Sequence, residues 1–214
     1  MRNDVRWFIG LCFVALLAAI LFNKCSNAQG VQEALRTRAY VRTSYGSGSG
    51  VWLGDEYFLT ARHIFGDSTQ MDIFFRNLWF RGQLVAEDGD VALVKSNYTK
   101  TGKKRRTLFA DVVAVGEPIY WIQPHYMPDA VLPLLVDGLA GYVRQDTLFI
   151  GTPGFPGASG TGIFNQQGKL ISVGMTLMAV QFSWKSPQIA GFRSLLVSGM
   201  TNIRRYLADE SISR

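Results

Sequence analysis

Three short stretches decide the fold: Thr60-Ala-Arg-His63, Asp90-Val-Ala-Leu-Val94 and Gly157-Ala-Ser-Gly160. They place a histidine, an aspartate and a serine in that order, each beside an apolar run or a glycine-rich turn. A serine hydroxyl is a poor nucleophile at neutral pH, so an acyl-transfer site needs a base beside it and an acid that orients the base. Each stretch alone is a weak signal, but their joint order and spacing predict such a site.

The body of the chain has the pattern of an all-β protein. Short runs rich in β-branched and aromatic residues recur about every 8 to 12 residues, separated by Gly, Asn, Asp and Pro. We expect two six-stranded antiparallel barrels, spanning residues 29–100 and 101–214. The strands are expected near 38–43, 48–53, 57–61, 71–76, 79–86 and 91–95, and then near 112–122, 131–143, 146–150, 161–165, 169–176 and 188–193. Met200, Ile203, Tyr206 and Leu207 have helical spacing and predict a short C-terminal helix.

The three stretches belong to a longer set of motifs. These are Gly46-Ser-Gly-Ser-Gly50 with Val51-Trp-Leu-Gly54, Tyr57-Phe-Leu-Thr-Ala-Arg-His63, Asp90-Val-Ala-Leu-Val-Lys95, Val115-Gly-Glu-Pro118, Gly157-Ala-Ser-Gly-Thr-Gly-Ile-Phe-Asn165 with Gly168-Lys-Leu-Ile171, and Ala190-Gly-Phe-Arg193. Over residues 38 to 208 the chain resembles trypsin-like (chymotrypsin-fold) serine proteases without disulfides, in the style of the bacterial exported Deg/HtrA protease domain. It departs from that family at Thr161, where glycine is usual, and in having no PDZ-type domain after the protease.

Candidate roles follow for the residues of these motifs. His63 is the expected base for Ser159, and Asp90 is expected to fix the histidine tautomer. Asp88 is a rival for that role, but Asp90 directly adjoins the strand of Val91 to Val94 and is therefore held more firmly. The N–H groups of Gly157 and Ser159 are the expected oxyanion hole. The competing interpretation is a glycine- and proline-rich hairpin loop without chemistry.

Specificity is predicted from the resemblance. In trypsin-like enzymes the pocket base lies six positions before the nucleophile, here Pro153, and Val173, Gly174 and Met175 are expected to form a wall. Neither 150–160 nor 170–178 contains Asp, Glu or His. An unpaired charge in such a pocket is costly, so we expect a neutral, small-to-medium apolar residue before the cleaved bond.

Two functions are compatible with the sequence. The resemblance implies a serine endopeptidase that cleaves protein or peptide substrates through an acyl-enzyme. The alternative is a catalytically silent protease-like module that binds extended peptides at the membrane by strand addition. No metal-ligand spacing, phosphate loop or cofactor motif is present, so no metal or cofactor is expected. A formal net charge of +6 is too small by itself to indicate a nucleic-acid partner.

The N-terminus predicts export. Residues 7–22 carry no charge and follow Arg2 and Arg6, which favours an N-terminal hydrophobic helix with its start in the cytoplasm and the protease across the membrane. We favour a single-pass signal anchor in residues 1–28. A signal peptide cleaved after Ala28, giving a secreted or periplasmic protein, is the alternative.

Three further segments have two interpretations each. Lys100, Lys103, Lys104, Arg105 and Arg106 are expected to be a solvated linker, or else a contact for anionic lipid or nucleic acid. Phe74, Phe75, Leu78, Trp79 and Phe80 are expected to fill the first barrel, or else to form an exposed docking patch. His125 lies in 123–128, which two prolines predict to be a surface loop rather than a catalytic segment.

Overall fold

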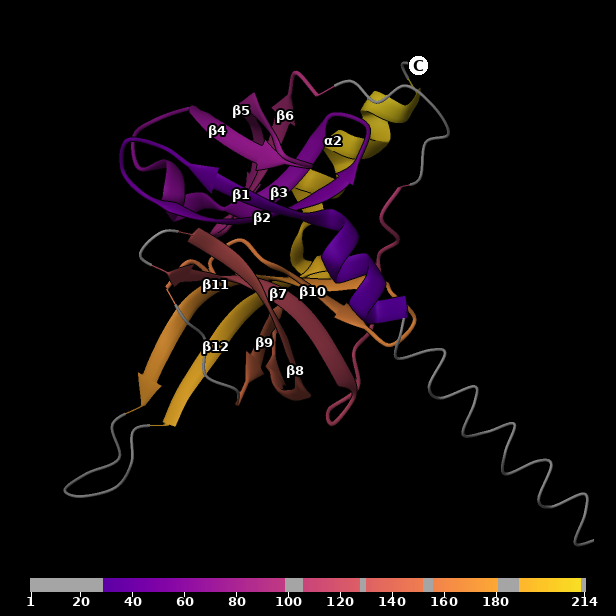
Figure 1. Ribbon diagram of the computed structural model, residues 1–214. Helices are drawn as coiled ribbons and strands as arrows, with labels where there is room; N and C mark the ends of the chain where they lie inside the picture. The colour runs from indigo at the N-terminus through magenta and orange to yellow at the C-terminus, as the bar shows by residue number, and fades with distance from the viewer. Residues whose placement is uncertain (1–28, 99–105, 128–129, 152–155, 181–188, 213–214) are drawn as a thin grey trace, which may run out of the picture.

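Two closed antiparallel barrels, one above the other in Figure 1, make up the body of this computed structural model. The structure describes residues 29–98, 106–127, 130–151, 156–180 and 189–212. The predicted fold class is confirmed, with six strands in each barrel and a C-terminal helix. An additional short helix, residues 29–37, precedes the first strand.

The first barrel is ordered β1-β2-β3-β6-β5-β4. Its strands are β1 (Arg38–Arg42), β2 (Ser47–Gly54), β3 (Tyr57–Ala61), β4 (Gln70–Phe75), β5 (Leu78–Asp88) and β6 (Val91–Ser96). Alternation of buried and partly exposed residues along β4 places Met71, Ile73 and Phe75 in the barrel interior. By contrast, β3 is buried at every residue, because one face fills the first barrel and the other packs against the second.

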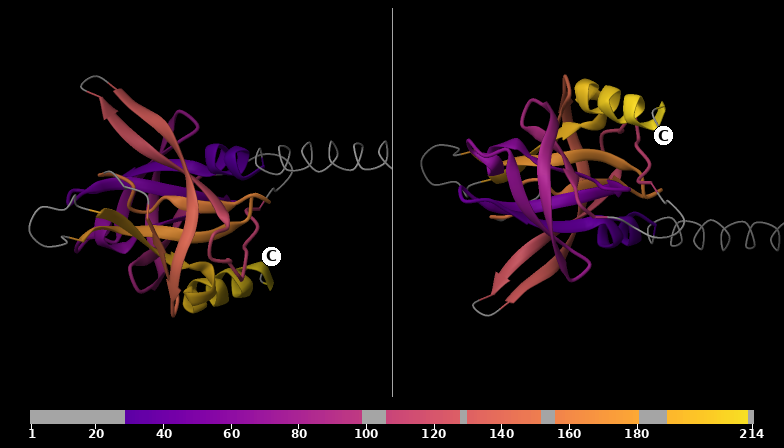
Figure 2. Two further views of the ribbon diagram at one scale, coloured as in Figure 1. Left: turned by 90° about the horizontal axis from the view of Figure 1, so that it is seen from below. Right: turned by 90° about the horizontal axis from the view of Figure 1, so that it is seen from above.

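The second barrel is ordered β10-β11-β12-β9-β8-β7. Its strands are β7 (Pro118–Met127), β8 (Ala130–Arg144), β9 (Thr147–Ile150), β10 (Gly162–Asn165), β11 (Leu170–Val180) and β12 (Ile189–Leu196). The hairpin of β7 and β8 extends beyond the body of the molecule, as both views in Figure 2 show.

The predicted position of the seventh strand is wrong. Val112 and Val115, which fall in the strand expected near 112–122, are 81% and 72% exposed; Val112 precedes the turn in which the Glu117 N–H donates to the Ala114 carbonyl, and Val115 lies within it. The strand starts later, at Pro118, and runs to Met127, through most of the segment 123–128 where a surface loop was expected. Pro124 is tolerated because it lies opposite Pro133 of β8, at a position where neither residue has to donate a ladder hydrogen bond.

The two terminal helices each pack on the barrel that is distant in sequence. The N-terminal helix leads into β1 but lies against the second barrel, where Gly30 closely approaches Tyr120 and the Asn165 carbonyl. The C-terminal helix, α2 (Thr201–Ile212), follows the second barrel but packs on the first, beside β5 and β3. There the ring of Tyr206 meets that of Tyr57 edge-on, 6.2 Å between centroids. Both helices thereby help to hold the barrels together.

Asp88 caps α2. This residue is 8% exposed, and its carboxylate accepts the Asn202 N–H at 3.2 Å and the Ile203 N–H at 2.8 Å. The first N–H groups of a helix have no partner within it, and a carboxylate there also interacts favourably with the helix dipole. Asp88, the alternative to Asp90 as the partner of His63, therefore faces α2 instead.

The cluster on the β4–β5 hairpin was expected to fill the first barrel, but only part of it does. Phe75 is 2% exposed and Phe80 packs against the same core. Leu78 and Trp79, however, are 60% and 49% exposed. Trp79 pairs with Phe74 on the outer face, whereas Phe80 pairs with Ile73 on the core face, and Leu78 directly follows the tight turn at Arg76 and Asn77, both with positive φ.

The predicted N-terminal hydrophobic helix and the domain boundary after residue 100 lie outside the described residues. Within the part of the chain that the structure describes, no helix is both long enough and apolar enough to cross a membrane. The anchor and the cleaved signal peptide thus both remain predictions.

Loss of the Asp88 cap should destabilise the whole fold. We expect Asp88→Ala to lower the free energy of unfolding by about 1–2 kcal/mol, because two buried helix N–H groups lose their acceptor. Urea denaturation measures this. Glu87→Ala is the matched control, since Glu87 is exposed and pairs only with Arg62 at the surface. Equal losses in the two variants would contradict the capping role.

Candidate active site

His63 and Asp90 are joined by two hydrogen bonds. His63 lies in the 3₁₀ turn η1 (Arg62–Phe65) that follows β3, and Asp90 lies in the turn between β5 and β6. The Nδ1 atom of His63 is 2.8 Å from Oδ2 of Asp90, and the main-chain N–H of His63 donates to Oδ1 at 2.9 Å. The Arg62 N–H also donates to the Asp90 carbonyl at 2.8 Å. These contacts favour the tautomer with the proton on Nδ1 and leave Nε2 available as a base.

The Asp90 hydrogen bond determines the electrostatics of His63. It raises the pKa of His63 above the usual 6.5, and the charge of Asp90 acts in the same direction, while partial burial opposes both. A pKa raised in the folded state stabilises the fold at pH values below 6.5, and this contribution is lost as the pH rises through the folded pKa.

Ser159 lies in a tight loop between Gly157 and Gly160, whose φ angles are +91° and +86°. Such angles favour glycine. The loop is fastened to β2, because the Ser49 N–H donates to the Ser159 carbonyl at 2.8 Å and the Ser49 hydroxyl donates to the Gly157 carbonyl at 2.7 Å. A side chain at Gly160 would overlap the Ser49 carbonyl and crowd Thr60 and Ala61. The loop therefore lies against the end of the strand that leads to His63.

The Ser159 hydroxyl is bonded away from the histidine. It donates to the main-chain carbonyl of Met175 on β11 at 3.0 Å. Among the described residues, no hydrogen bond joins Ser159 to His63. A turn of the serine side chain about χ1 is therefore required before the histidine can take its proton.

The expected oxyanion donors are the N–H groups of Gly157 and Ser159. Neither donates to an acceptor within the described part of the chain. The neighbouring Gly160 N–H, by contrast, is bound to the Gly174 carbonyl at 2.7 Å, which fixes the end of the loop on β11. Within the described residues, the two expected donors therefore have no other acceptor.

The predicted specificity residues are only partly described. Pro153 lies outside the described residues. Val173 is fully buried and Met175 is 6% exposed, and both side chains pack in the core between the barrels. It is the main chain of Gly174 and Met175 that lies against the serine loop. A pocket wall at Val173, Gly174 and Met175 stays a prediction.

Three polar residues that hold the loop lie within the sequence motifs, but the motifs gave them no such role. Besides Ser49, the buried hydroxyl of Thr60 donates to the Ser49 carbonyl at 2.7 Å, and that of Thr161 donates to the Ile122 carbonyl on β7. Thr161 stands where related proteins usually have glycine, and its hydroxyl adds a tie between the loop and the second barrel. Burial of short hydroxyl side chains beside glycines is the signal that could have indicated them.

The sequence of this chain also matches a known protein family. Residues 48–175 match the family described as the trypsin-like peptidase domain, which is more than half of the chain. The chain belongs to this family. A search of curated protein sequences gives no significant match.

Solved structures with the same fold include three proteases of low sequence identity to this trypsin-like peptidase domain. An HtrA-type protease, AlgW, determined with a tripeptide, has a TM-score of 0.64 and 19% identity, over 86% of this chain and 64% of that one. A serine endoprotease from Yersinia pestis has a TM-score of 0.62 and 19% identity, over 86% and 65%. The serine protease of a human pathogenic astrovirus has a TM-score of 0.57 and 14% identity, over 78% and 91%. This chain thus spans less than two thirds of the first two proteins, and the likeness at these identities concerns the fold.

The His63 titration should depend on Asp90. We expect Asp90→Asn to lower the pKa of His63, because the hydrogen bond and charge that raise it are weakened while burial still opposes protonation. The measurement is an NMR pH titration of the His63 imidazole. Its signal is identified as the one that is missing from the spectrum of His63→Gln. Asp88→Asn, which changes the helix cap instead, should leave that midpoint in place. A midpoint unmoved by Asp90→Asn would refute the electrostatic role of Asp90.

Proposed function

We propose that this chain is a serine endopeptidase that hydrolyses peptide bonds through an acyl-enzyme, with His63, Asp90 and Ser159 as its catalytic residues. Membership of the trypsin-like peptidase domain family implies peptide substrates and a relation to serine proteases. The single observation that carries the finer proposal is the double hydrogen bond of Asp90 to His63, beside the glycine-bounded loop of Ser159.

The proposed reaction uses each group in turn. Nε2 of His63 accepts the Ser159 proton while Oγ attacks the substrate carbonyl carbon, and Asp90 stabilises the resulting imidazolium. The N–H groups of Gly157 and Ser159 donate to the oxyanion of the tetrahedral intermediate. His63 then gives the proton to the leaving amine, which leaves an ester on Ser159. Water, deprotonated by His63, attacks this ester, and His63 returns the proton to the Ser159 oxygen as the acid leaves.

One observation favours the silent peptide-binding alternative: in the resting structure the Ser159 hydroxyl is bonded to Met175 and not to His63. A neutral hydrogen bond of this kind contributes only about 1 kcal/mol, so it is easily exchanged when the side chain rotates. We therefore retain the catalytic role, and a direct chemical test separates the two functions.

Reaction with a fluorophosphonate probe provides that test. We expect covalent labelling of the wild-type chain and no labelling of Ser159→Ala, whereas Ser47→Ala, which removes an exposed serine of β2, should react normally. With a peptide substrate, Asp90→Asn should lower kcat by about 10⁴, as the corresponding change does in a well-studied triad. Asp88→Asn should leave kcat nearly unchanged. An unlabelled wild-type chain, folded by circular dichroism, would instead support the silent module.

We also propose that residues 1–28 anchor the protease to a membrane, with the barrels on the exported side, since Arg2 and Arg6 precede the apolar run. Alkaline carbonate extraction of cell membranes should leave the full chain in the membrane pellet. Release of a chain that begins at Gln29 would demonstrate signal cleavage and rule out the anchor. An Arg2→Glu, Arg6→Glu variant should show less correctly exported protein.

A further inference from the structure

A groove of about 600 Å³ lies between the two barrels, apart from the proposed catalytic residues. Its lining comes from the N-terminal helix, β1, the β4–β5 hairpin and the paired strands β7 and β8. The lining residues used below are Arg38, Tyr40, Phe74, Arg76, Trp79 and Gln123. We call it the inter-barrel groove. Its size is that of a ligand site, in the range of about 300–1,000 Å³.

The charge of the inter-barrel groove is positive. Among its lining residues Arg36 is paired with Glu33. Arg38 instead donates to the Leu35 carbonyl, and Arg76 donates to the Tyr98 hydroxyl. No carboxylate of the described chain forms an ion pair with either, and the lining contains no Asp or Glu. The groove is therefore complementary to carboxylates, which arginine binds with two parallel hydrogen bonds.

The wall of the inter-barrel groove is aromatic. Trp79, half exposed, packs against Phe74 at 5.1 Å and meets Tyr40 edge-on at 6.2 Å. Arg42 lies over the outer indole face at 4.2 Å. These contacts fix the indole in an exposed position, where it gives no stability to the barrel core. A held, half-exposed tryptophan is typical of a binding surface.

The floor of the inter-barrel groove holds an unsatisfied amide. Gln123 on β7 is fully buried, and neither Oε1 nor Nε2 has a hydrogen-bond partner in the described structure. Burial of an unpartnered amide costs free energy, so nearly all such groups in proteins are satisfied. An amide offers one acceptor and one donor side, which matches the N–H and C=O of a peptide group.

We propose that the inter-barrel groove binds an acidic segment of a polypeptide that also carries apolar side chains. The carboxylates would pair with Arg38 and Arg76, an apolar side chain would pack on Trp79 and Phe74, and a peptide group would satisfy the buried Gln123 amide after rotation of that side chain exposes it to the groove. This binding does not depend on the proposed proteolysis, because none of His63, Asp90 and Ser159 lines the groove.

Fluorescence anisotropy with two labelled peptides tests the proposal. The probe is a peptide of about ten residues in which aspartates alternate with leucines, and its twin has lysines in place of the aspartates. The protein is the full chain carrying Ser159→Ala, so that the probe cannot be cleaved. We expect the acidic peptide to bind and the basic twin not to bind. Arg38→Glu and Trp79→Ala should each weaken binding at least tenfold.

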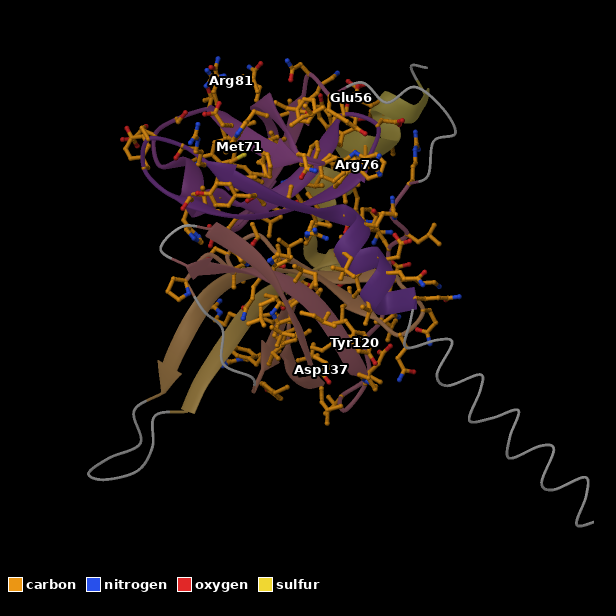
Figure 3. All side chains as sticks on the ribbon, viewed as in Figure 1. Glu56, Met71, Arg76, Arg81, Tyr120 and Asp137 are labelled. Carbon is orange, nitrogen blue, oxygen red and sulfur yellow. The ribbon has the colours of Figure 1, made fainter. Side chains whose placement is uncertain are left out.

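Arg81→Glu is the matched control, because Arg81 is an exposed arginine of the same hairpin that does not line the groove. Figure 3 shows Arg81 at the outer edge of the first barrel and Arg76 nearer to the second. The affinity of the Arg81→Glu variant for the acidic peptide should stay within twofold of that of the chain with Arg81. Equal affinity in Arg38→Glu and Arg81→Glu would overturn the proposal. Binding of phosphatidylserine vesicles that Arg38→Glu abolishes, without peptide binding, would assign the groove to a membrane surface and also overturn it.

Gln123→Leu separates a binding role from a structural one. Leucine has a similar size and removes both unsatisfied atoms, so we expect a higher melting temperature together with weaker peptide binding. A glutamine that serves only the fold would give the opposite result, a lower melting temperature with unchanged affinity. Labelling by the fluorophosphonate probe should be the same in all groove variants, so failure of peptide binding and failure of catalysis are told apart.

Discussion

Two hydrogen bonds from Ser49 fasten the loop of Ser159 to the first barrel, one from its N–H and one from its hydroxyl. His63 belongs to the first barrel and Ser159 to the second, so the relative position of these proposed catalytic residues depends on how the barrels meet. Gly160 permits this meeting, because only a residue without a side chain fits against the Ser49 carbonyl. Each hydrogen bond contributes about 1 kcal/mol, and together they hold the loop of Ser159 in one position on β2.

The sequence was sufficient for the strand pattern, because alternation and turn residues are local signals. It failed at β7, where a strand was expected from residue 112 but Val112 and Val115 are exposed and precede the strand, and where Pro124 suggested a loop but faces another proline. Both errors have one cause: a strand is defined by its partner, and the partner was unknown. The same applies to Trp79, whose side of the sheet depends on the turn at Arg76 and Asn77.

For the site, the sequence motifs indicated His63, Asp90 and Ser159, and the structure brings Asp90 against His63 and takes Asp88 to α2. The sequence did not indicate that Ser159 bonds to Met175, or that Ser49, Thr60 and Thr161 hold the loop. Those contacts join residues up to 108 positions apart and depend on the packing of one barrel on the other. Motifs therefore indicate candidate reactive groups, whereas tertiary packing decides how their side chains are oriented. Ser49 also contributes to the lining of the inter-barrel groove, so that surface and the serine loop share one residue.

The packing of α2 on the first barrel affects the order of events on the ribosome. The strands of the first barrel end at Ser96, yet the helix that covers Asp88 and Tyr57 begins only at Thr201. During translation the first barrel thus emerges with a buried acid uncapped and an aromatic face uncovered, and it stays so while about 100 further residues are made. A nascent chain that stalls between β12 and α2 has all twelve strands but an unfinished first barrel. The first barrel therefore gains its cap and the cover over Tyr57 only once α2 has been made.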